Sequence, residues 1–151
     1  MIKKIRSGGQ TGADRAALDA ARKLNIPITG WVPKGGWAED DAHLLELYPE
    51  LLETSSFDPA LRTRLNVRNS DATLIFLPED CVSPGTDLAI AFSKELEKPY
   101  FVASLETPSL VISSWLSALG DIELNIAGPR ESEYPGIYNL VFSILSNLLA
   151  E

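Results

Sequence analysis

The chain has 151 residues, of which 45% are hydrophobic, and a formal net charge of −8. This length and hydrophobic fraction favour one folded domain over residues 1–151, and the acidic charge argues against nonspecific binding to nucleic acid. Because no run of about 18 apolar residues and no secretory leader occur, and because Cys81 is the only cysteine, we expect a cytoplasmic protein that does not cross a membrane.

Short apolar runs alternate with longer amphipathic stretches along the chain. The strands are expected at 1–5, 26–30, 72–77, 99–103 and 122–127. The helices are expected at 13–24, 61–67, 86–97, 109–119 and 137–148. In the helix at 86–97 we expect the inward face to be formed by Leu88, Ala91, Phe92 and Leu96. The irregular segment 31–57 should pack down through a short helix that carries Leu44, Leu47, Tyr48, Leu51 and Leu52.

This alternation predicts an α/β fold of three layers, α/β/α, around a mostly parallel sheet of five strands. Numbering only these strands in chain order, we expect the spatial order 2-1-3-4-5. Ligands of such folds bind beyond the carboxyl ends of the strands, near the point where the strand order reverses. The loops that follow the first, third and fifth strands should therefore carry the function.

The loop after the first strand opens the sequence "SGGQTGADRAALDAA", residues 7–21. Its glycines and the start of the following helix predict a phosphate site made of backbone N–H groups, with side-chain hydrogen bonds added. The alternative is a tight turn in which Thr11 caps the helix. Arg15 would either offset the charge of Asp14 or be solvated. The candidate ligand-binding residues here are Ser7, Gly8, Gly9, Gln10, Thr11, Gly12 and Arg15.

Two further loops resemble the first in chemistry. After the third strand, Pro84, Gly85 and Thr86 form a second glycine-containing helix start that Thr86 could cap. After the fifth strand, Arg130 could hold a phosphate or carboxylate with two hydrogen bonds, or it could be solvated. We expect these loops to make one anion-binding crevice with the loop after the first strand.

The irregular segment 31–57 contains residues that could contact a ligand by ring stacking and by charge. Trp31 or Trp37 could stack on a base or pterin ring and Lys34 could contact a phosphate, or the tryptophans could simply anchor the loop. The acidic run 39–41 could bind Mg²⁺ or begin a helix, and we predict no metal site. In the next helix, Arg62 and Asn66 should share one face.

Catalytic groups are sparse in this sequence. His43 is the only histidine and has no nucleophile near it in sequence. The only candidates for a general acid or base are Asp14, Glu39 and Glu131.

Five segments of the chain are distinctive when taken together: "SGGQTGADRAALDAA", "GWVPKGGWAEDD", "RTRLNVRNSDATLIF", "PGTDLAIAF" and "NIAGPRESEYPGIY". Together they resemble the family of putative molybdenum carriers, a circularly permuted branch of the Rossmann-like group that contains lysine-decarboxylase-like and cytokinin-activating proteins. The resemblance implies a Rossmann-like nucleotide-binding fold, a homodimer or homotetramer, and a nucleotide or molybdenum cofactor near the glycine loops. Gly36 stands where the relatives commonly have arginine, and Ala89 stands where the enzymatic relatives have a catalytic glutamate.

The sequence therefore favours a protein that binds a phosphorylated nucleotide-like or pterin ligand, with molybdenum cofactor carriage as one form of that function. A nucleotide-directed hydrolase, similar to a phosphoribohydrolase, is the enzymatic alternative. A structural or partner-binding module is the third, and it predicts an exposed apolar patch and an empty, shallow crevice. The residues leave the choice of ligand and the presence of catalysis open.

Overall fold

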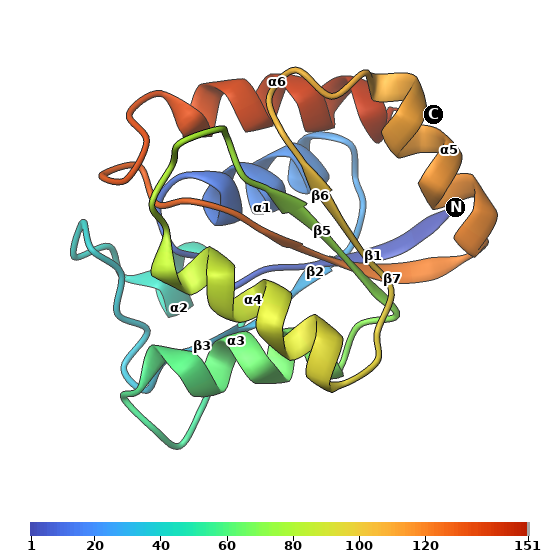
Figure 1. Cartoon of the computed structure of the whole chain (residues 1–151). Coiled ribbons are helices and arrows are strands. Elements are labelled where there is room, and N and C mark those ends of the chain that lie inside the picture. Colours follow the sequence, from blue (N-terminus) through green and yellow to red (C-terminus); the bar gives the residue numbers. More distant parts are fainter. Residues whose placement is uncertain (151) are drawn as a thin grey trace.

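The computed structural model describes residues 1–150 and contains each strand and helix expected from the sequence (Figure 1). The strands are β1 (Ile2–Arg6), β2 (Ile28–Thr29), β3 (Trp31–Val32), β4 (Leu52–Glu53), β5 (Ala72–Phe76), β6 (Tyr100–Ala103) and β7 (Ile122–Ala127). The helices are α1 (Ala13–Lys23), α2 (Leu44–Leu47), α3 (Pro59–Arg68), α4 (Pro84–Glu95), α5 (Ser109–Leu119) and α6 (Ile137–Leu148). Among residues 1–150, no helix combines the length and the apolar character that crossing a membrane requires.

The central sheet has five strands, all parallel, in the order β2-β1-β7-β5-β6. The predicted order 2-1-3-4-5 is wrong, because the last strand lies between the first and the third. Alternation of strands and helices does not determine which edges pair, and here β7 pairs with both β1 and β5. The almost wholly buried side chains of β7 suit this central place, whereas the partly exposed β6 suits an edge.

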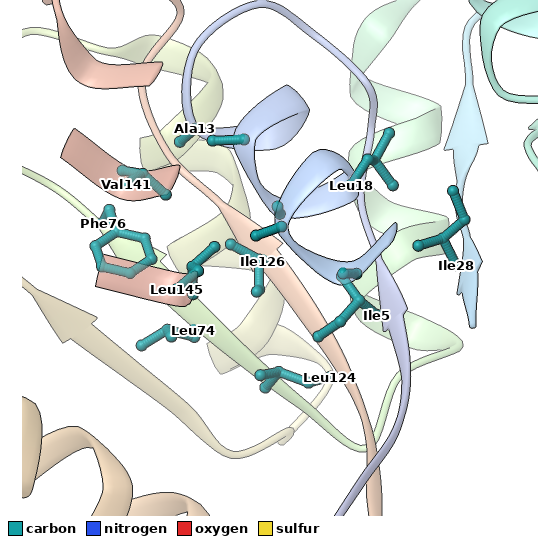
Figure 2. Packing of buried hydrophobic residues seen from close by; sticks show 14 of the residues in the cluster. Ile5, Ala13, Leu18, Ile28, Leu74, Phe76, Leu124, Ile126, Val141 and Leu145 are labelled. Carbon is teal, nitrogen blue, oxygen red and sulfur yellow. The ribbon is translucent and has the colours of Figure 1, made fainter. Parts of the chain in front are cut away.

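The sheet lies between two helical layers, with α1, α5 and α6 on one face and α3 and α4 on the other (Figure 1). The fold is thus a Rossmann-like α/β/α arrangement. Alternate strand residues point into the layer of α1 and α6, where they form the main hydrophobic core shown in Figure 2. Its strand residues include Ile5, Leu74, Phe76, Leu124 and Ile126, and its helix residues include Leu18, Val141 and Leu145. The alanine-rich inner face of α1 lets this helix lie close to the sheet.

The opposite face of the sheet is more polar. Thr73 and Asn125 lie side by side there, joined by a hydrogen bond of 3.3 Å. The face of α4 that turns inward consists of Thr86, Ala89 and Ser93, all buried.

The predicted inward face of α4 is wrong. Leu88 is 38% exposed, Ala91 is exposed, and Phe92 and Leu96 are only partly buried. Helical spacing fits both sets of residues, and the sequence interpretation chose the more apolar one. Small side chains turn inward because a cleft, described below, lies beneath this helix.

The segment 31–57 forms a small parallel pair, β3 and β4, with α2 between them. Leu44, Tyr48 and Leu51 are buried as expected, but Leu47 and Leu52 are about half exposed. The interpretation of residues 39–41 as a helix start is wrong, because α2 begins only at Leu44.

A carboxylate on α1 fixes this segment against the rest of the molecule. Asp19 accepts a hydrogen bond of 2.6 Å from the Tyr48 hydroxyl and another from the Tyr138 hydroxyl of α6. Burial raises the pKa of both phenols, to about 12 for Tyr138, and their hydrogen bonds to Asp19 add to that shift. Both phenols therefore stay protonated and continue to donate near neutral pH.

Candidate functional site

A cleft of about 430 Å³ lies at the carboxyl ends of the central strands. Its walls come from the loops that follow β1, β5 and β7, and from α3 and α4. These loops are the ones expected from the sequence to carry the function. They converge because β7 lies between β1 and β5, so that all three loops leave neighbouring strands.

The cleft brings together only part of the predicted ligand-binding set. The predicted residues that line it are Gly8, Gln10, Trp37, Pro84, Gly85, Thr86 and Arg130. The predicted residues outside its lining are Ser7, Gly9, Thr11, Gly12, Arg15 and Lys34. The first loop thus faces the cleft at fewer positions than expected.

The backbone N–H groups of the first loop are largely used by the protein itself. Gly9 N donates to Ser7 Oγ at 3.2 Å, and Thr11 N donates to Gln10 Oε1 at 3.0 Å. Gln10 N points to Asp14 Oδ2 at 3.4 Å. Side chains of the same loop and of α1 therefore take three of these N–H groups, whereas those of Gly8 and Gly12 have no acceptor within residues 1–150. The phosphate site predicted at this loop stays a prediction with fewer donors than expected.

The glycines of the first loop serve close packing between loops. Gly12 has φ +82°, and a Cβ atom there would overlap the carbonyl oxygen of Pro129 in the loop after β7. At Gly8, a Cβ atom would lie 2.5 Å from Arg62 Nη1. The absence of side chains lets the loop after β7 and the Arg62 guanidinium come within contact of the first loop.

Thr11 does not cap α1, contrary to the alternative considered from the sequence. The N-cap residue is Gly12, and no side chain caps the helix. The Thr11 hydroxyl instead donates to Glu39 and accepts from Glu131 N at 3.1 Å. It therefore links the first loop to the segment 31–57 and to the loop after β7.

The second glycine loop is more open to a ligand. Ser83, not Thr86, is the N-cap residue of α4, and Pro84 is the first helical residue. The Ser83 hydroxyl is bonded to Thr86 Oγ1 at 2.7 Å and donates to Glu133 Oε1 at 2.8 Å. No acceptor in residues 1–150 takes the backbone N–H groups of Gly85 and Thr86. These donors stand at the positive end of a helix that borders the cleft.

Two arginines line the cleft. Arg130 makes ion pairs of 3.4 Å with Glu39 Oε1 and with Glu133 Oε2. Arg62 reaches over from α3 and donates Nη1 to the Gly8 carbonyl at 2.7 Å. From the sequence, Arg62 and Asn66 were expected to share one face of a helix, but Arg62 was not predicted to belong to the site. That shared polar face was the signal from which its place in the site could have been predicted.

The two tryptophans have different environments. Asn66 holds Trp31 by its backbone, accepting from Trp31 N at 2.7 Å and donating to Trp31 O at 3.0 Å. Trp31 does not line the cleft, which favours the anchoring interpretation for this residue. Trp37 does line the cleft and is 48% exposed, so this tryptophan remains a candidate for contact with a ligand.

The remaining predicted cations are occupied elsewhere. Arg15 Nη1 contacts Asp40 Oδ2 at 2.5 Å, so Arg15 neither lines the site nor stands free in solvent. Lys34 Nζ lies 5.3 Å from the centre of the Phe57 ring, outside the cleft lining. The positive charge of the cleft therefore comes from α3 and from the loop after β7.

Asp14 is the one acidic candidate from the sequence that lines the cleft. It is 9% exposed, and burial raises its pKa to about 6, although the nearby Arg62 charge and the Gln10 N–H oppose the shift. A carboxyl group with a pKa near neutrality can donate or accept a proton at physiological pH.

The other acidic candidates are structural. Burial opposes ionisation of Glu39, but hydrogen bonds from Ser132 and Thr11 outweigh it and lower its pKa. Glu131 accepts from the backbone N–H groups of Gly136 and Tyr138 at 2.6 and 3.0 Å, at the start of α6.

Burial raises the pKa of the Cys81 thiol, which keeps this thiol protonated near neutral pH. Over residues 1–150, no group of three or more His, Cys, Asp or Glu side chains is placed to hold a metal ion.

Comparison with known proteins agrees with the resemblance drawn from the sequence. The model of the Circularly permutated YpsA SLOG family matches residues 5–149. A crystal structure of a putative molybdenum carrier protein from Syntrophus aciditrophicus SB is similar to this chain, with 42% identity and a TM-score of 0.91. The match covers 99% of this chain and 96% of that one. A comparison with curated proteins finds no match.

Proposed function

This chain belongs to the circularly permuted YpsA SLOG family, and from that premise we propose that it binds a phosphorylated nucleotide-like or pterin ligand in the cleft. The observation that carries the proposal is the pair of free N–H groups at Gly85 and Thr86. They border the cleft at the positive end of α4, and Arg62 and Arg130 line the same cleft.

The phosphate belongs at the start of α4. Backbone N–H groups at a helix start bind oxyanions because several donors converge and the helix dipole favours negative charge. Arg130 lines the same cleft and its guanidinium is held only by two long ion pairs, so a phosphate can compete for it. The first loop contributes the backbone of Gly8 and the side chain of Gln10, and the first turn of α1 contributes the side chain of Asp14.

The organic part of the ligand extends along the remaining wall. Trp37 is about half exposed in the cleft lining, and a base or pterin can stack on its ring. A volume of about 430 Å³ suits a small ligand, whose sites commonly measure roughly 300–1,000 Å³.

Calorimetric titration with nucleoside monophosphates tests the proposal. Arg130→Gln should weaken binding about tenfold, which corresponds to losing one charge-assisted hydrogen bond. Arg64→Gln is the matched control, since Arg64 pairs with Glu95 on α3 and α4 but does not line the cleft. If no phosphorylated ligand binds or raises the melting temperature at millimolar concentration, the proposal is wrong.

Molybdenum cofactor carriage is one form of this function. The similar crystal structure is named a putative molybdenum carrier protein. A pterin with a phosphate fits the chemistry of the cleft, which offers phosphate donors at α4 and an aromatic ring at Trp37. Native mass spectrometry of protein purified from its own cells tests this form directly, because a retained cofactor adds its mass. Sedimentation in the same preparation tests the homodimer or homotetramer that we also propose.

A nucleotide-directed hydrolase is the second candidate, favoured by the raised pKa of Asp14 in the cleft. Asp14 would act as the general acid or base in cleavage of an N-glycosidic or phosphate bond. Ala89 lines the cleft where enzymatic relatives carry a glutamate, so Asp14 would have to work without that group. Product from a nucleoside monophosphate panel, lost in Asp14→Asn, supports this candidate, and absence of product across the panel rejects it.

A further inference from the structure

The orientation of the Gln10 side chain in the cleft is fixed by two backbone donors. Its Oε1 accepts from Thr11 N at 3.0 Å and from Glu39 N at 2.9 Å. Since both donors need the carboxamide oxygen, the Nε2 group must point the other way. Gln10 is 5% exposed and lines the cleft, and within residues 1–150 its Nε2 has no hydrogen-bond acceptor.

The carboxyl group of Asp14 lines the same cleft, and its Oδ2 lies 3.4 Å from the backbone N of Gln10. Within residues 1–150, Oδ2 receives no other hydrogen bond and Oδ1 receives none. In the same range, the fully buried side-chain atoms without a partner are only Arg15 Nε and Ser146 Oγ. Gln10 Nε2 and Asp14 Oδ1 are therefore accessible, and both residues line the cleft.

Gln10 and Asp14 thus present an unpaired donor and an unpaired acceptor to one cleft, which limits the ligands that can pair with both. Each costs free energy unless a ligand or water meets it. The complement is a ring edge with a carbonyl oxygen, a ring N–H and an exocyclic amino group in a row. Guanine and pterin share this edge, the 2-amino-4-oxo pyrimidine edge.

We propose that the cleft selects ligands with a 2-amino-4-oxo pyrimidine edge, whose carbonyl accepts from Gln10 Nε2 and whose two N–H donors meet the Asp14 carboxylate. This inference rests on the proposed binding of a phosphorylated ligand and specifies its ring. Two parallel N–H···O bonds to one carboxylate are the strong, direction-specific form of hydrogen bonding. The phosphate remains at the start of α4.

The inference orders four nucleotides that carry the same phosphate. GMP satisfies all three contacts, while IMP lacks only the amino group. XMP places a carbonyl oxygen against Asp14. AMP sets an amino donor against Gln10 Nε2 and an unprotonated ring nitrogen against Asp14, so it matches none of the three positions and should bind most weakly. We expect GMP to bind roughly tenfold more tightly than IMP, as one charge-assisted hydrogen bond gives.

Asp14→Asn gives the sharpest test by isothermal titration at pH 7.5. Asparagine keeps an oxygen for Gln10 N but replaces the second acceptor with an N–H donor. We expect the affinity of the variant for GMP to fall roughly tenfold or more and its affinity for XMP to rise, so that the order of the two affinities reverses. Asp87→Asn, in the first turn of α4, removes the same charge without removing an acceptor from the cleft and should leave the order unchanged.

A second variant and a second ligand complete the design. Gln10→Glu keeps Oε1 for its two backbone donors but replaces Nε2 with an oxygen, and it should weaken binding of GMP. Because it adds a second buried carboxyl group to the cleft, it should also lower the melting temperature at pH 7.5, so binding is measured at a temperature at which the variant is folded. Neopterin monophosphate distinguishes a pterin site from a guanine site, because it shares the ring edge but not the ribose.

The possible results separate this inference from the proposed function. If AMP binds as tightly as GMP, or Asp14→Asn weakens both equally, the ring assignment is wrong while phosphate binding stands. If neither the four nucleotides nor neopterin monophosphate binds, both the ring assignment and the proposed function are wrong.

Discussion

Replacing Asp14 with asparagine should change how the stability of the protein depends on pH. The carboxyl group is 9% exposed and receives only one long hydrogen bond, from Gln10 N at 3.4 Å. Burial therefore outweighs the attraction of Arg62 and raises the pKa of Asp14 from 3.8 to about 6. Asparagine has nearly the same shape but no charge to desolvate, so the variant isolates this effect.

The sign and size follow from the two pKa values. Because the folded state holds the proton more tightly than the unfolded state, the stabilising contribution is complete below pH 3.8 and is lost as the pH rises through about 6. A shift of about 2 units is worth roughly 3 kcal/mol in full. Between pH 4.5 and pH 8, the wild-type protein should lose about 2 kcal/mol relative to Asp14→Asn.

Urea unfolding of both proteins at several pH values measures this difference. The other carboxyl groups titrate in both proteins, so their contributions cancel when the two free energies of unfolding are subtracted. Arg62 and Gln10 are unchanged in the variant and keep the cleft geometry comparable. Curves of stability against pH that run parallel from pH 4.5 to pH 8 would refute the assignment of a buried, raised carboxyl group at position 14.

Further variants test the loops, the arginine and the tyrosine contact. Gly12→Ala should lower the free energy of unfolding by about 3 kcal/mol, because position 12 has a positive φ and an added Cβ would overlap a backbone carbonyl. Gly85→Ala is the control, since the space around its Cβ is open, and it should change the free energy of unfolding by less than about 1 kcal/mol. Equal effects of the two variants in urea unfolding would contradict the packing role of Gly12. Arg62→Met should raise the pKa of Asp14 further, because Arg62 lowers it, and NMR titration of the carboxyl carbon would show the upward shift or its absence. Tyr138→Phe should cost about 1 kcal/mol in thermal unfolding by removing one of the two hydroxyl donors to the α1 carboxylate, and an unchanged melting temperature would show that this hydrogen bond contributes nothing.

The secondary structure could be predicted from the sequence because its signals are local. The alternation that indicates β5 and β7, and the spacing that indicates α1 and α6, lie within ten or so residues. The convergence of the functional loops also followed, since the carboxyl ends of parallel strands share one edge of a sheet. Ala17, Leu18 and Ala21 are fully buried as their helical spacing predicts.

The faces of α4 and the strand order could not be read in the same way. Both Leu88 and Ala89 lie on faces with acceptable helical spacing, and only packing over the cleft turns Ala89 inward. The pairing of β7 with β1 and β5 depends on contacts between distant segments of the chain.

The sequence by itself determined the α/β class, the five strands of the central sheet with their helices, and the three loops that meet at the cleft, because periodicity and glycine content act over short distances. It did not indicate the small pair β3 and β4. The tertiary structure alone decided which polar atoms in those loops stay open to a ligand. Some hydrogen-bond partners come from far along the chain. The backbone N–H of Glu39, for example, donates to Oε1 of Gln10. The polar groups left to the cleft include the Gln10 amide, the Asp14 carboxyl group, and the N–H groups of Gly85 and Thr86. They are left because hydrogen bonds between distant parts of the chain pair many of the other donors and acceptors of these loops.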